Sequence, residues 1–267
     1  MVQFEIPLDD SEIESFLQQI RVSKTEPSVK FLKQIINGIV EHVPFQNLTM
    51  LTAPRRRPSV ETIKFEMLNG LGGLCTARNP FLHELLRHLG FEPRFVSSTM
   101  GEPDCHISLL VKIDNEDWWV DVGNGYPYFE PVKLGDGKIH SNWFFSYRIV
   151  NNSNRWEVLH GSTSDWTLNH FFTDEGVDFS RFDRMHDLHY TVPGWGPFLT
   201  GLRVNRFWSD GGAILRDMRA TSPHGEEFLN SPKQIMDWLK TWFSSGFFEK
   251  VDVNTAFESW QSIKNGE

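Results

Sequence analysis

Cysteine is scarce in this chain of 267 residues, which has only Cys75 and Cys105. Two cysteines are too few for a disulfide framework or a structural zinc site. Long apolar runs are missing as well, since no apolar stretch of about 18 residues occurs, so we expect no membrane-spanning helix. Basic residues are outnumbered, 26 Lys and Arg against 35 Asp and Glu, and the net charge of -9 has the wrong sign for a general nucleic-acid binder.

Three further absences narrow the class of protein. The segment 1–10 has acidic residues and no basic region, which argues against a secretory signal, so we expect a soluble cytoplasmic protein. The 10 His residues include no HExxH or similarly spaced pair, so we expect no metal. Gly and Pro are present in ordinary numbers, 20 and 14, which excludes a collagen-like or disordered chain.

The first 90 residues have apolar positions at helical spacing. Ser11 and Glu14 match a capping box at the start of one helix. A second helix is predicted over 29–43, and it ends before Pro44 because the residue before a proline avoids helical dihedrals. A third helix is predicted to begin at Pro58-Ser59.

From residue 92 the apolar period changes to two, which predicts strands. The expected strands are 94–98, 106–113, 118–122, 145–150, 156–160, 166–172, 202–208 and 213–219. Ser231-Pro232 then predicts the start of a further helix. Helices, then strands, then a mixture of both predict an α+β fold, which we divide into a helical lobe (1–90), a β-barrel (91–190) and an α/β lid (191–267).

Cys75 is the first candidate for catalysis. It follows Gly72-Gly73, which allow a sharp bend and close approach of a substrate. A thiol near a helix N-terminus is easier to ionise. Asn79 as N-cap and Pro80 in the first turn, however, predict a helix that starts four residues after Cys75, which weakens this effect. The alternative is a small buried cysteine with a purely structural role.

His106 and Asp121 lie on two consecutive predicted strands. Counted from a turn centred near residue 114 they are equally far away, which predicts a directly opposite cross-strand pair with Cβ atoms about 4.5–5.5 Å apart. An aspartate among apolar residues is costly unless it is paired, and an imidazole N–H is the obvious partner. Asp121 would then orient His106 toward a nucleophile. The alternative is a structural hydrogen-bonded pair.

Several segments together resemble the arylamine N-acetyltransferase family. They are Gly72-Gly73-Leu74-Cys75, the apolar strand that starts at His106, Val120-Asp121-Val122-Gly123, Val43-Pro44-Phe45-Gln46-Asn47-Leu48, which is similar to the family's (I/V)PFENL segment, and Leu188-His189-Tyr190 with Pro193 and Phe198, which is similar to its NHY…P…F segment. Their order along the chain is that of the family.

The resemblance implies a helical lobe, a central antiparallel β-barrel and an α/β lid around a cleft. It also implies a Cys–His–Asp triad of the cysteine-protease type, carried onto Cys75, His106 and Asp121. Acetyl-CoA or another acyl-CoA is the implied donor co-substrate, without a metal. The substrate-binding residues that it suggests are Phe45, Asn124, Gly125 and Phe198.

This chain departs from the family pattern at several positions. Where the family has Arg-Gly-Gly-x-Cys-x-Glu, Leu71 and Ala77 replace the two charged residues, which suggests apolar packing in place of an ion pair. Asn124 stands where the family often has an aromatic residue. The acyl donor chemistry is less affected by this change than the choice of an arylamine acceptor.

We therefore expect a cytoplasmic acyltransferase that forms an amide through acyl-Cys75 by a ping-pong mechanism. Three alternatives stay open: an amide synthase that uses a carrier-protein or other biosynthetic thioester, a thiol hydrolase, and an inert ligand-binding member. The basic run Arg55-Arg56-Arg57 is more typical of a solvated loop than of a site for CoA phosphates. Arg203 and Arg206 are equally good candidates for binding these phosphates.

Overall fold

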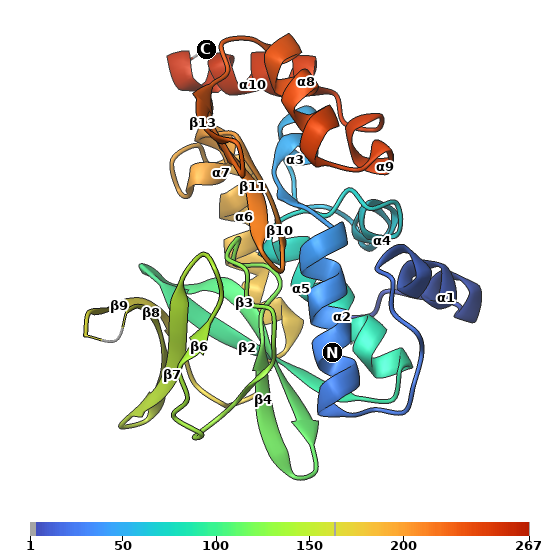
Figure 1. The fold of residues 1–267 in the computed structure, drawn as a ribbon, viewed down its shortest axis with the longest axis vertical. Coiled ribbons are helices and arrows are strands. Elements are labelled where there is room, and N and C mark those ends of the chain that lie inside the picture. Colours follow the sequence, from blue (N-terminus) through green and yellow to red (C-terminus); the bar gives the residue numbers. More distant parts are fainter. Residues whose placement is uncertain (1–3, 163, 267) are drawn as a thin grey trace.

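Helices dominate the N-terminal third of the computed structural model, which describes residues 4–162 and 164–266 (Figure 1). They are α1 (Asp10–Gln19), α2 (Val29–His42), α3 (Leu48–Thr52), α4 (Val60–Leu68) and α5 (Cys75–His88). The predicted second and third helices are confirmed, with Ser59 as the N-cap of α4. The capping box of α1 is formed by Asp9 and Glu12, so its prediction at Ser11 and Glu14 was wrong by two residues.

The middle of the chain forms a curled antiparallel sheet. Its strands are β2 (Glu92–Met100), β3 (Glu102–Ile113), β4 (Glu116–Val120), β5 (Val132–Lys133), β6 (His140–Ser141), β7 (Ser146–Asn152), β8 (Arg155–Gly161) and β9 (Trp166–Phe172). They lie in the order β5-β4-β3-β2-β9-β8-β7-β6. Within the described residues the outer strands β5 and β6 do not pair with each other, so the predicted barrel is an open, half-barrel sheet.

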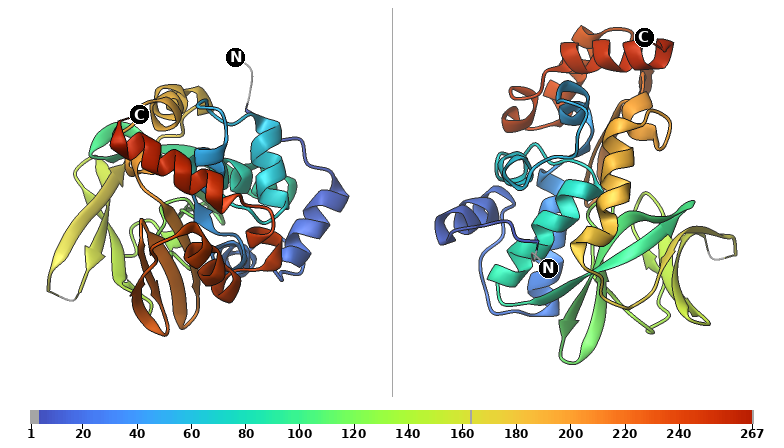
Figure 2. Two further views of the ribbon diagram at one scale, coloured as in Figure 1. Left: turned by 90° about the horizontal axis from the view of Figure 1, so that it is seen from above. Right: turned by 180° about the vertical axis from the view of Figure 1, so that it is seen from behind.

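The C-terminal part contains a second sheet flanked by helices. Its elements are η1 (Phe179–Phe182), α6 (Asp183–Thr191), α7 (Pro197–Thr200), β10 (Arg203–Trp208), β11 (Gly211–Arg216), β12 (Arg219–Ser222), β13 (Gly225–Phe228), α8 (Pro232–Trp242), α9 (Ser245–Phe248) and α10 (Val253–Asn265). The helix predicted after Ser231-Pro232 is confirmed as α8. Figure 2 shows the C-terminal helices gathered at one end of the molecule, at the far end from the curled sheet.

A short N-terminal strand joins the C-terminal sheet. β1 (Phe45–Gln46) pairs with β10, and the order of this sheet is β1-β10-β11-β12-β13. The segment just after α2 thus belongs structurally with residues 203–228, although the three residue ranges assigned to the lobes stay a prediction. Gln46 N–H also donates to Gly73 O at 3.2 Å, which links this sheet to the segment before Cys75.

The apolar core has three parts. One lies between the N-terminal helices and strands β2 to β4, the second joins α3 to the C-terminal sheet and helices, and the third is enclosed by the curled sheet. Leu71 belongs to the second part and Ala77 to the first, and both are buried. Among the described helices, none is both long enough and apolar enough to cross a membrane.

Candidate active site

Cys75 is the first residue of α5, and Leu74 is the N-cap. The predicted helix start at Asn79 was therefore wrong, because Pro80 lies inside the helix. Proline lacks an N–H, so the helix leaves the Thr76 carbonyl without its usual donor, and His186 hydrogen-bonds to that carbonyl. Since Cys75 lies in the first turn, its sulfur benefits from the positive end of the helix dipole after all.

Two glycines allow the backbone to pack tightly around Cys75. A Cβ on Gly72, which has φ +74°, would lie 1.8 Å from the Pro44 carbonyl oxygen. A Cβ on Gly123 would lie 2.5 Å from the Cα of Cys75. The chain after β4 therefore passes directly against the first residue of α5, which brings Asp121 close to Cys75 in space.

His106 and Asp121 form a buried hydrogen-bonded pair. His106 Nε2 lies 2.7 Å from Asp121 Oδ2, and the His106 side chain also hydrogen-bonds with the Cys75 thiol. The two residues are not directly opposite, because the β3–β4 turn contains only Asp114 and Asn115 and pairs Leu109 with Val120. Asp121 follows the last residue of β4 and reaches His106 diagonally, on the same face of the sheet.

Asn79 holds the Asp121 carboxylate from the opposite side. Its Nδ2 donates to Asp121 Oδ1 at 2.9 Å, and its Oδ1 accepts the Val122 N–H at 3.0 Å. Asp121 Oδ1 also accepts the Gly123 N–H at 2.8 Å. Asn79, which the sequence predicts as a helix cap, instead lies one helical turn after Cys75 and therefore on the same face of α5.

Charge on the His106–Asp121 pair is favoured despite burial. Burial by itself lowers the pKa of His106, but the charge of Asp121, the hydrogen bond that Asp121 accepts from the ring and the hydrogen bond with Cys75 hold that pKa well above its ordinary value. Burial raises the pKa of Asp121, but His106 lowers it overall. The neighbouring His170 has a pKa of about 3, because of burial and the charge of His106, so it stays neutral.

Arg78 is a buried cation next to this pair. Its Nε donates to the Val122 carbonyl at 2.5 Å, and its Nη1 donates to the Val43 carbonyl. Burial lowers its pKa to about 9, opposed by the charge of Asp121, so Arg78 stays protonated at neutral pH. Arg78 therefore fixes the two backbone segments, at Val43 and Val122, that pack near Cys75.

A cavity of about 390 Å³ opens at Cys75 and His106. All four residues predicted to bind substrate, Phe45, Asn124, Gly125 and Phe198, line it, although their roles stay a prediction. Phe45 and Phe198 pack edge to face with ring centroids 6.1 Å apart. Tyr126 also lines the cavity and supplies an aromatic wall close to Asn124. A cavity of this size is typical of a small-molecule site.

The arginines that we considered for CoA phosphates have different surroundings. Arg203 lines the cavity and pairs with Asp217 at 2.9 Å, and Arg216 lines it as well. Arg206 donates to the carbonyls of Glu41 and Trp242, so its guanidinium is used within the fold. Arg57 pairs with Asp183 at 2.5 Å outside this cavity.

One group of described side chains has the composition of a metal site. The ligand atoms of His106, Asp121 and His170 lie within 4.8 Å of one another. His106 and Asp121 already hydrogen-bond each other, and a metal there would separate them. The absence of a metal stays a prediction.

The fold is that of solved arylamine N-acetyltransferases. The enzyme from Salmonella typhimurium has a TM-score of 0.84 at 18% identity, covering 95% of this chain and 98% of that one. The Mycobacterium marinum arylamine N-acetyltransferase in complex with CoA has a TM-score of 0.82, also at 18% identity, with 94% and 99% covered.

Sequence comparison then identifies the family. The model of the N-acetyltransferase family matches residues 28–245, so the chain belongs to the arylamine N-acetyltransferase family and is an acetyltransferase of that family. Among its relatives is proansamycin X synthase of Amycolatopsis mediterranei (strain S699), which is 23% identical over 194 residues, 66% of this chain and 73% of the relative.

Proposed function

We propose that this acetyltransferase moves an acetyl or other acyl group from acyl-CoA to an amine through an acyl-Cys75 intermediate, forming an amide. The observation that carries the proposal is the hydrogen-bonded series from Cys75 through His106 to Asp121 at the wall of a cavity. CoA as the donor is supported by the Mycobacterium marinum structure, which is a complex with CoA.

In the first half-reaction His106 accepts the Cys75 proton, and the thiolate attacks the thioester carbonyl. The carbon–sulfur bond to CoA breaks, and the CoA sulfur takes the proton from His106. Asp121 keeps the imidazole aligned and stabilises its charge throughout. At the start of α5 the Ala77 and Arg78 N–H groups already donate to Leu74 O, whereas the Cys75 and Thr76 N–H groups come too early in the helix to have a partner within it. We infer that they stabilise the oxyanion, each contributing a factor of about 10²–10³ in rate.

In the second half-reaction the amine nitrogen attacks the acyl-cysteine carbonyl. His106 removes a proton from the nitrogen, the bond to the Cys75 sulfur breaks, and the thiolate regains the proton from His106. The aromatic walls formed by Phe45, Tyr126 and Phe198 favour an acceptor with a flat apolar body. A panel of aromatic amines and hydrazines with acetyl-CoA measures this preference.

A second candidate function is amide synthesis from a biosynthetic or carrier-protein thioester, which the similarity to a relative named as a synthase favours. It uses the same three side chains and differs only in the donor. The two donors are separated by intact-mass measurement after incubation with each thioester, because only a productive donor leaves an acyl adduct on the protein.

Variants of the two cysteines test the nucleophile. We expect acetyl-CoA to add one acetyl group to the wild type and to Cys105→Ser but none to Cys75→Ala, which should also lose turnover while its unfolding temperature stays close to that of the wild type. Substantial turnover by Cys75→Ala contradicts the proposal. CoA release without an adduct or a need for amine indicates hydrolysis, and failure of iodoacetamide to alkylate Cys75 at neutral pH indicates an inert member.

A further inference from the structure

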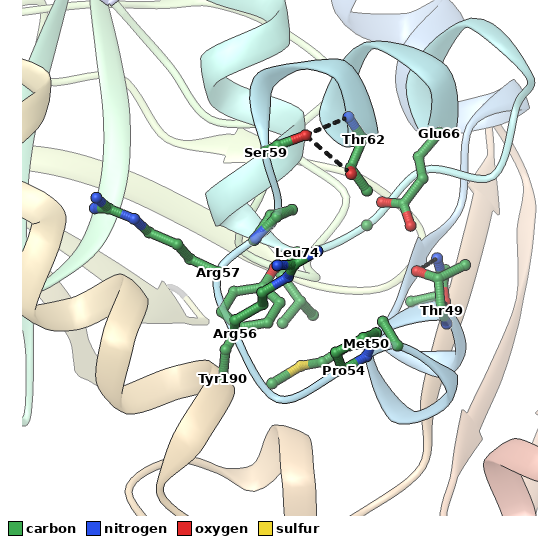
Figure 3. A pocket seen from close by; sticks show the side chains of 14 residues that line it. Thr49, Met50, Pro54, Arg56, Arg57, Ser59, Thr62, Glu66, Leu74 and Tyr190 are labelled. Atoms are coloured by element: carbon green, nitrogen blue, oxygen red, sulfur yellow. Dashed lines mark hydrogen bonds between the residues drawn. The ribbon is translucent and has the colours of Figure 1, made fainter.

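A second cavity, of about 380 Å³, lies beside the segment that precedes Cys75 (Figure 3). Its wall is built from α3, α4, the loop between them, the Gly73–Leu74 segment and Tyr190 of α6. None of its lining residues lines the cavity at Cys75. The mechanism proposed above makes no use of it.

Glu66 of α4 lines this second cavity and differs from the other shielded carboxylates. Every other Asp or Glu in the described chain that is buried or half-buried has a Lys, Arg or His nitrogen within 3.9 Å. Glu66 is half-buried and forms no ion pair with any described residue. Its hydrogen-bond partner is the Thr49 hydroxyl.

The two arginines of the cavity do not supply the missing charge. Arg57 pairs with Asp183 at 2.5 Å, and in Figure 3 its side chain extends away from Glu66. Arg56 is exposed and forms no ion pair with any described residue, Glu66 included. Burial raises the pKa of Glu66 to about 7, with the Thr49 hydrogen bond acting in the opposite direction. A carboxyl group beside an open cavity thus lacks the basic nitrogen that every other shielded carboxylate of the described chain has nearby.

The rest of the wall fits the body of a small organic ligand. Met50, Leu74 and Tyr190 present apolar surface, and Thr49 and Thr62 add hydroxyl groups, of which that of Thr62 hydrogen-bonds to Ser59. The volume is within the range of small-molecule sites. A planar cation that presents two N–H groups matches a carboxylate with two parallel hydrogen bonds.

We propose that this cavity is a binding site for a small organic cation with a flat apolar body, whose amidinium or ammonium group pairs with the Glu66 carboxylate. The site is separate from the acyl-transfer chemistry, so this proposal does not depend on the function proposed for Cys75. Because Gly73 and Leu74 form part of its wall, a ligand there contacts the residue that caps α5 directly before the sulfur.

Benzamidine is a suitable probe, and benzamide is its neutral counterpart of the same shape. At pH 8 we expect calorimetric titration to show benzamidine binding to the wild type and to Glu258→Gln, which changes an exposed glutamate of α10. Glu66→Gln should bind it at least tenfold more weakly, and benzamide should not distinguish the two. Equal benzamidine affinity for the wild type and Glu66→Gln overturns the proposal, as does tighter binding of benzoate than of benzamidine.

The pH dependence gives a test that needs no variant. Benzamidine stays cationic between pH 6 and 8, whereas Glu66 ionises over this range. The affinity of benzamidine for the wild type should therefore rise about tenfold from pH 6 to pH 8. A flat profile contradicts the proposal. Cys75→Ala should bind benzamidine as the wild type does, so an error in the assignment of Cys75 leaves this result unchanged.

Discussion

Asp121 and Glu66 are two shielded carboxylates with opposite properties. Asp121 is fully enclosed, yet its pKa is lowered, because His106 and Asn79 hydrogen-bond to it and His106 provides positive charge. Glu66 is less completely enclosed, yet burial raises its pKa to about 7. Burial penalises charge at both positions, so the difference comes from the partner.

At Asp121 the fold itself stabilises the ionised carboxylate, whereas at Glu66 a ligand has to stabilise it. The fold supplies Asp121 with a cation, two N–H groups from Asn79 and Gly123 and a fixed position. It supplies Glu66 with a hydroxyl group and an open space.

The largest effect is expected for Asp121→Asn. The amide cannot neutralise an imidazolium and can favour the wrong tautomer of His106, so kcat should fall by about 10³–10⁴. Steady-state acetyl transfer is the measurement, with thermal unfolding as the control for folding. A loss below tenfold in a folded variant would show that Asp121 does not act through His106.

A smaller effect is expected for Asn79→Ala, which removes one hydrogen bond to the Asp121 carboxylate and two to the backbone. Loss of a bond to a charged group costs about 1.5–3 kcal/mol, so kcat should fall by about 10- to 100-fold. If Asn79 positions Asp121, the pH at which the rate of Cys75 alkylation reaches half its maximum also shifts. Lower stability with unchanged kcat and an unchanged profile would assign Asn79 a structural role alone.

Glu66→Gln should stabilise the protein at high pH. The folded-state pKa is raised from 4.5 to about 7, so this group weakens folding as pH rises from about 4.5 to about 7. Glutamine removes that penalty, which gives a gain of about 1–3 kcal/mol at pH 8 and none near pH 4. Urea unfolding at both pH values measures the change in the free energy of unfolding. An equal change at pH 4 and pH 8 would contradict the raised pKa of Glu66.

The smallest effect is expected for Glu130→Gln. Hydrogen bonds from His140 and then Lys33 lower the pKa of Glu130 to about 2, so its contribution to stability is present above about 4.5 and is lost as pH falls toward 2. The side chain is 32% exposed, and solvent screening limits the contribution to about 0–1 kcal/mol. Unfolding at pH 7 and pH 3 measures this contribution. A loss of more than about 2 kcal/mol in the free energy of unfolding at pH 7 would show that the bonds to His140 and Lys33 outweigh solvent screening.

Local motifs predicted which residues meet beside Cys75, because Cys75 begins α5, His106 lies in the first half of β3 and Asp121 directly follows β4. The details failed where one residue changes the geometry. The β3–β4 turn was predicted to be centred near residue 114, but it consists of Asp114 and Asn115, both with positive φ, and is centred between them. Placing the turn centre one residue too early shifts the predicted strand register by two residues.

Other features gave no usable sequence signal. Helix α6 was missed because its buried face includes His186, His189 and Tyr190 rather than aliphatic residues. Pro80 was taken as a helix start because proline favours the first turn, but the contact of His186 with the Thr76 carbonyl lies far away in sequence. Nothing in the sequence marks Glu66, because its character depends on which cations are absent around it in space.

The backbone pairing around β1 has a mechanical consequence. Gln46 N–H donates to Gly73 O, Gly73 N–H donates to Pro44 O, and Phe45 pairs with Asn205 of β10. A movement of the C-terminal sheet away from the Cys75 sulfur would have to displace the 44–46 segment and Gly73 as well, or break the hydrogen bonds between them. Admission of large molecules therefore depends on side-chain rearrangement at the rim more than on a hinge between sheet and helix.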